Sequence, residues 1–98
     1  VFIPFSPNVW AALFPMGQLV ATPGAIGAIP PKDIIHALGR HARGDWGEVC
    51  EEDKVANDRA LNVGARLLSV YESANGIRFW IITEADRTVT TILLPGEY

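Results

Sequence analysis

Residues 65–94 read ARLLSVYESANGIRFWIITEADRTVTTILL, and this stretch decides the fold. Runs of apolar and β-branched residues, which are typical of strands, occupy residues 65–73, 77–83 and 88–94. Asn75 and Gly76 tolerate the positive φ angles that a two-residue hairpin turn requires, and residues 84–87 can form a second turn. The stretch therefore predicts a three-stranded antiparallel meander with residues 77–83 in the middle.

The alternation of side chains along these strands assigns them to two faces. With a two-residue turn at Asn75-Gly76, Tyr71 pairs with Trp80. The face expected to pack beneath the helices carries Leu68, Val70, Ile77, Phe79, Ile81, Ile92 and Leu94. The opposite face carries Leu67, Ser69, Tyr71, Trp80, Ile82, Glu84, Val89, Thr91 and Leu93.

An antiparallel sheet commonly leaves its second face polar, but the second face predicted here is largely apolar. Contiguous exposed apolar surface marks interaction sites. We therefore expect this face to be an interface, and a two-fold homodimer is the simplest assembly because one self-complementary patch closes on itself. The interface candidates are Tyr71, Trp80, Ile82, Val89 and Leu93.

The chain before the meander predicts one more strand and short helices. Residues 17–22 read as a strand that adds to an edge of the sheet, and residues 25–29 as one helical turn. Residues 32–42 carry apolar side chains at helical spacing, and residues 51–63 begin with three acidic residues, which favour a helix N-terminus. The expected class is α+β: an antiparallel sheet of three to four strands with two to three short helices packed mainly on one face.

The first fifteen residues form an apolar arm with no charged side chain and three prolines. The arm is too short and too interrupted by proline to span a membrane, and it lacks the basic start of a secretory signal. We expect residues 1–15 to be either non-native sequence or interface-forming, and residues 16–98 to be a single domain.

Composition narrows the classes of function. The chain has 98 residues and a formal net charge of −3, and it contains no run of basic residues. This argues against a nucleic-acid partner, because phosphate binding gains from a basic patch. Cys50 is the only cysteine, so neither an internal disulfide nor a cysteine-rich zinc site can form. We expect a cytoplasmic protein without a membrane contact.

Four polar residues are the candidates for catalysis: His41, Asp45, Glu84 and Asp86. A carboxylate can orient a histidine base, and paired carboxylates can carry out acid–base chemistry or bind a cation. The structural alternatives are a histidine at a helix C-terminus and carboxylates that bond to their own turns. For all four residues we favour the structural roles.

No other motif indicates a cofactor or a metal. His36 and His41 are five residues apart, so they lie on different sides of a helix. Gly24 and Gly27 complete neither glycine fingerprint of a phosphate-binding loop. We therefore expect no cofactor and no metal ion.

Four segments together resemble a family of small bacterial proteins called plasmid-related proteins, which are carried on plasmids, integrative elements and gene cassettes. The segments are residues 17–25 (GQLVATPGA), His41 with residues 44–47 (GDWG), residues 82–87 (ITEADR) and residues 90–98 (TTILLPGEY). The resemblance covers residues 16–98. It implies a bacterial, cytoplasmic protein encoded by mobile DNA, and no established activity comes with it.

Two functions follow as hypotheses. The first is a non-enzymatic accessory or protein-interaction protein, which acts as a homodimer or binds a host or mobile-element protein. The alternative is a small hydrolase or ligand-binding enzyme that uses the His/Asp/Glu cluster. The two differ in whether His41, Asp45, Glu84 and Asp86 meet in one pocket.

Overall fold

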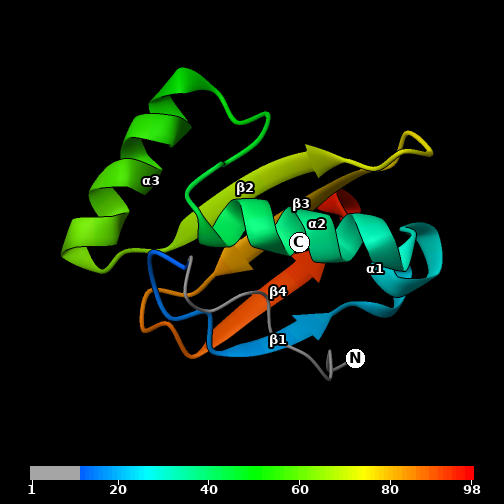
Figure 1. Cartoon of the computed structure of the whole chain (residues 1–98), viewed down its shortest axis with the longest axis horizontal. Helices are drawn as coiled ribbons and strands as arrows, with labels where there is room; N and C mark the ends of the chain where they lie inside the picture. Colours follow the sequence, from blue (N-terminus) through cyan, green and yellow to red (C-terminus); the bar gives the residue numbers. More distant parts are fainter. Residues whose placement is uncertain (1–11) are drawn as a thin grey trace.

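The computed structural model describes residues 12–98 and contains one four-stranded sheet with three helices (Figure 1). The predicted α+β class is confirmed. In chain order the elements are β1 (Gln18–Ala21), α1 (Pro23–Ala28), α2 (Pro31–Ala42), α3 (Glu51–Val63), β2 (Leu67–Glu72), β3 (Arg78–Thr83), β4 (Val89–Leu93) and a 3₁₀ turn at Pro95–Glu97.

The strands lie in the order β1-β4-β3-β2. β2, β3 and β4 form the predicted antiparallel meander with β3 between its two partners. β1 adds to the edge at β4, as expected, and it runs parallel to β4. The sheet is therefore mixed. The long connection from β1 to β4 contains all three helices and the strands β2 and β3.

Short-range signals place the helix ends. The Thr22 hydroxyl accepts a hydrogen bond from the Ala25 amide at 3.1 Å and so caps α1. Pro31 occupies the first position of α2, where its missing N–H costs nothing. Gly64 ends α3 with a φ of 72°, a left-handed conformation that suits glycine.

The predicted register of the first hairpin is wrong by one residue. Tyr71 pairs with Phe79, and Val70 pairs with Trp80. The loop holds three residues instead of two, because the Ser73 amide donates to the Ile77 carbonyl and Gly76 takes a φ of 80°. A slip of one residue turns every side chain of β2 to the other face.

This slip corrects the faces of β2. Leu67, Ser69 and Tyr71 lie on the face beneath the helices, and Leu68 and Val70 lie on the opposite face. Tyr71, an interface candidate from the sequence, is therefore buried in the core with 2% of its surface exposed. The second loop moves the pairing of β3 and β4 by two residues, which leaves their predicted faces unchanged.

The helices α1 and α2 cover one face of the sheet (Figure 1). The core beneath them is made of Leu19, Ala21, Ala25, Ile29, Ile34, Ala37, Leu38, Tyr71, Phe79, Ile81 and Ile92. The helix α3 contacts β2 and lies beside the edge of the sheet that β2 forms. Phe14, Trp46, Ala60 and Leu67 form a second cluster there.

The arm predicted at residues 1–15 lies mostly outside the described residues. Of its last residues, Leu13 donates its amide to the Ala42 carbonyl at 2.8 Å, and Phe14 is buried against Trp46. These residues are part of the packed domain, so a truncation that removes the arm alone ends at residue 11.

Candidate functional site

His41 lies at the C-terminal end of α2 and points into the interior, where none of its surface is exposed. Its Nδ1 is 2.6 Å from the Ser69 hydroxyl on β2, and its Nε2 is 2.9 Å from the Thr83 hydroxyl on β3. The Thr83 hydroxyl is hydrogen-bonded to the Thr90 hydroxyl on β4 at 2.7 Å, and the Thr90 hydroxyl donates to the Met16 carbonyl at 2.6 Å. One chain of hydrogen bonds thus joins α2 to three strands.

The carbonyl at the end of this chain fixes the position of every proton. Because a carbonyl only accepts, the Thr90 hydroxyl donates to Met16, so Thr83 must donate to Thr90. Thr83 then accepts from His41, which places the imidazole proton on Nε2. The Nδ1 atom accepts from Ser69, and each donor in the chain has one acceptor.

Burial keeps this imidazole neutral. Desolvation, with the positive charge of Arg87 as a second cause, lowers the pKa of His41 to about 3. The rings of Phe14 and Trp46 enclose the imidazole at centroid distances of 5.4 and 5.7 Å. Since His41 and Ser69 are both shielded from solvent, their contact fastens the helix to the sheet rather than exposing a nucleophile to a substrate.

Asp45 belongs to a different arrangement at the loop after α2. Arg40 donates to both of its carboxylate oxygens, at 2.7 and 3.1 Å, and the guanidinium lies 4.7 Å from the centroid of the Tyr71 ring. The hydrogen bond from Arg40 lowers the pKa of Asp45. The Tyr71 hydroxyl donates to the Asp45 carbonyl at 2.6 Å. These contacts hold the loop that turns the chain toward Trp46.

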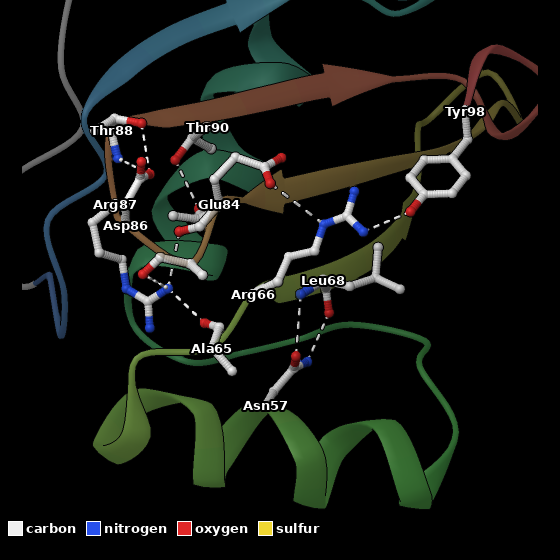
Figure 2. Close-up of polar contacts among 12 residues, drawn as sticks. Asn57, Ala65, Arg66, Leu68, Glu84, Asp86, Arg87, Thr88, Thr90 and Tyr98 are labelled. Atoms are coloured by element: carbon white, nitrogen blue, oxygen red, sulfur yellow. Dashed lines mark hydrogen bonds and ion pairs between the residues drawn. The ribbon is translucent and has the colours of Figure 1, made fainter.

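Glu84 and Asp86 lie at the turn between β3 and β4 but serve separate contacts (Figure 2). The Glu84 carboxylate is 3.7 Å from the Arg66 guanidinium. Asp86 accepts from the amide and the hydroxyl of Thr88 at 3.1 and 2.6 Å, which is the local turn bonding expected of aspartate.

Arg87, next to these carboxylates, ties the turn to the end of α3. Its guanidinium donates to the carbonyls of Ala65 at 2.6 Å and Glu84 at 3.1 Å (Figure 2). It also donates to the Ala60 carbonyl at 3.0 Å. Its backbone has a φ of 61°. The sequence contains no pattern that marks this role, because the three acceptors are main-chain atoms that only the fold brings together.

The four catalytic candidates are therefore distributed over separate arrangements. Within residues 12–98, the side chains of His41, Asp45, Glu84 and Asp86 share no hydrogen-bonding or ion-pairing partner. His41 lies on the covered face of the sheet, while Glu84 pairs with Arg66 on the opposite face (Figure 2). Among the described residues, no group of three or more His, Cys, Asp or Glu side chains is arranged to hold a metal ion.

The face opposite the helices is the site that the fold leaves for binding, and we call it the open face. Its strand residues are Leu68, Val70, Trp80, Ile82, Val89, Thr91 and Leu93, and the register adds Gln18, Val20, Glu72 and Arg78. Four of the five interface candidates are among them. Ile82 and Leu93 are buried, with exposed fractions of 4% and 5%. Trp80, Val89, Leu68 and Val70 are half-buried.

A pocket of about 240 Å³ lies on the open face, lined by Arg66, Leu68, Trp80, Ile82 and Tyr98. Its floor is apolar. One end of its rim is polar, because Arg66 donates to the Tyr98 hydroxyl at 2.6 Å (Figure 2). The Tyr98 ring lies edge-on to Trp80 with centroids 5.5 Å apart. Sequence reasoning missed Arg66 and Leu68 because the register of the predicted strand 65–73 was wrong by one residue, and it missed Tyr98 because this residue follows the last predicted strand.

The sheet edge at β2 is closed to further strands along most of its length. Asn57 of α3 donates to the Leu68 carbonyl at 2.7 Å and accepts from the Leu68 amide at 3.1 Å (Figure 2). Val70 bonds to the Trp46 carbonyl and the Glu48 amide at 3.1 and 2.8 Å. These contacts occupy the main-chain groups that an added strand would need, so a further strand cannot pair with β2 at Leu68 and Val70.

Comparison of the chain with protein-family models, curated protein sequences and solved structures finds no match. Within residues 12–98, none of the helices has both the length and the apolar character needed to cross a membrane.

Proposed function

We propose that this protein is a non-enzymatic interaction protein that associates with a second copy of itself through the open face. The observation that carries the proposal is the half-buried, largely apolar surface around Trp80, which the two covering helices do not reach. Aromatic side chains at the centre of a patch are the usual anchors of protein interfaces.

The charges around the open face support a second copy as the partner. Arg66 lies 3.7 Å from Glu84, and Arg78 donates to Glu48 at 3.0 Å. Each of these cations is thus accompanied by an acid, and the face presents both signs of charge at its margin. A second copy presents the same pattern, and a two-fold rotation can bring the cation of one protomer opposite the acid of the other.

The size of the surface indicates a weak dimer. Four strands about 4.8 Å apart, each about five residues long at about 3.3 Å per residue, present a flat area of roughly 300 Å². A stable interface buries about 800 Å² on each partner. We therefore expect association that depends on concentration, with monomer dominant in dilute solution and dimer at high concentration.

The alternative enzyme built on His41, Asp45, Glu84 and Asp86 has no support from their geometry, because each side chain is engaged elsewhere. The origin in bacterial mobile DNA, which the sequence resemblance implies, belongs to the proposal and rests on that resemblance alone.

Light scattering coupled to size exclusion, carried out over a range of protein concentrations, tests the proposal. We expect the mean mass to rise with concentration for the wild type and for Val55→Lys, a control on the exposed side of α3. Trp80→Arg and Val70→Lys should each keep the protein monomeric. A strict monomer at millimolar concentration, for both the full chain and a chain that begins at residue 12, would overturn the dimer.

A further inference from the structure

The pocket on the open face combines an apolar floor with a cation that is only partly engaged. Arg66 contributes one hydrogen bond to Tyr98, and its Nε is 3.7 Å from Glu84, which is beyond hydrogen-bond length. Its side chain is 46% exposed. A guanidinium has five N–H donors, so Arg66 retains donors that can reach a ligand.

Arg40, on the helix-covered side of the sheet, is an arginine of the same protein that is paired with a carboxylate through two hydrogen bonds. It forms two short bonds with the Asp45 carboxylate and lies over the Tyr71 ring. Arg66 has an equivalent aromatic neighbour, since its guanidinium is 5.1 Å from the centroid of the Tyr98 ring. What Arg66 lacks is the carboxylate held in two-bond geometry, which is the arrangement that arginine favours.

We propose that the pocket binds a small aromatic carboxylate, whose ring lies against Trp80 and whose carboxylate pairs with Arg66. The floor of Leu68, Trp80 and Ile82 is apolar and suits a ring, and Trp80 and Tyr98 provide aromatic surfaces for it. The volume of about 240 Å³ is below the roughly 300–1,000 Å³ of sites for larger ligands, so a single ring with a short acidic arm is the expected size.

Glu84 opposes this binding, and its effect can be measured. Its carboxylate competes with the ligand for Arg66 and repels the negative charge of the ligand. The competition is modest, because an exposed ion pair at 3.7 Å is weak. Removal of the Glu84 charge should therefore tighten binding, whereas removal of the Arg66 charge should weaken it.

The site does not depend on the dimer proposed above, although both use the open face. A ligand in the pocket and a second copy on the face would compete. The mass of the protein is therefore measured in the same samples. A protein that binds the ligand and stays monomeric at every concentration would support the pocket and refute only the dimer.

The experiment is an NMR titration of the ¹⁵N-labelled full chain with phenylacetate and with its neutral isostere phenylacetamide. The readout is the indole N–H signal of Trp80. We expect saturable shifts, with phenylacetate bound about tenfold more tightly than the amide, the effect of about 1.4 kcal/mol from a charge-assisted contact.

Matched variants assign the charge effect to this site. Arg66→Gln should remove the preference for the acid, and Glu84→Gln should increase it. Lys32→Gln, which removes a positive charge at the start of α2 on the other side of the sheet, should leave it unchanged. Equal binding of acid and amide, no saturable shift, or the same change in Arg66→Gln and Lys32→Gln would overturn the proposal. If Arg66→Gln does not fold, the Glu84→Gln titration decides the matter alone.

Discussion

Acidification from pH 7 to pH 5 should destabilise this protein through His41. The pKa of His41 is about 3 in the folded chain, where burial disfavours the imidazolium, and its ordinary value in the unfolded chain is 6.5. Below pH 6.5 the unfolded chain therefore binds a proton that the folded chain excludes. Stability is unaffected above that pH and is lost progressively as the pH falls toward 3.

The size of the loss follows from the two pKa values. Each pH unit between them changes the free energy of unfolding by about 1.4 kcal/mol, so the loss at pH 5 is about 2 kcal/mol. That is a large part of the roughly 5–15 kcal/mol that stabilises a typical domain. Asp45, Asp86 and Glu97 have lowered pKa values, and the stability that they contribute is lost only below about pH 4.5, outside this window.

Urea unfolding at pH 7, 6 and 5, followed by circular dichroism, measures this loss. His41→Gln keeps a donor and an acceptor but has no titrating group, so its stability should be nearly constant over the window. His36→Gln, on the exposed side of α2, should lose stability as the wild type does. A wild type with equal stability at pH 7 and pH 5, or a His41→Gln variant with the same loss as the wild type, would refute the reasoning.

Two further predictions concern buried polar contacts. Thr90→Val removes the link between Thr83 and the Met16 carbonyl and should cost about 2 kcal/mol in urea unfolding, whereas Thr91→Val on the open face should change little. Asn57→Ala should cost a similar amount and promote concentration-dependent aggregation, because it exposes the edge of β2. Asn62→Ala, exposed on the same helix, is its control, and equal effects of the two would contradict the role of Asn57.

The candidate site shows which of its residues the alternation of side chains along the strands predicted and which it did not. Alternation along β3 and β4 placed Trp80, Ile82 and Val89 on one face correctly, because the second turn changed the pairing by an even number of residues. On β2 the same reasoning failed. Asn75-Gly76 suits hairpin loops of two different lengths. In the observed loop the Ser73 amide donates to the Ile77 carbonyl, and the Ser73 hydroxyl accepts from the Ile77 amide.

The amino-acid sequence by itself determined the class of fold, the strand order of the meander, the ends of α2 and α3 to within one residue, and the presence of a second apolar face; the turn expected at residues 25–29 is the helix α1 at Pro23–Ala28. These features depend on neighbours a few residues apart, whose periodicity and backbone preferences are visible in the sequence. The tertiary structure alone decided that His41 joins α2 to three strands, that Asn57 closes the edge of β2, and that Arg66 and Tyr98 form the rim of a pocket. The contacts made by His41, Asn57 and Arg66 themselves join residues from 11 to 42 positions apart. Their partners are set by the register and packing of whole elements, where a shift of one residue exchanges the two faces of a strand.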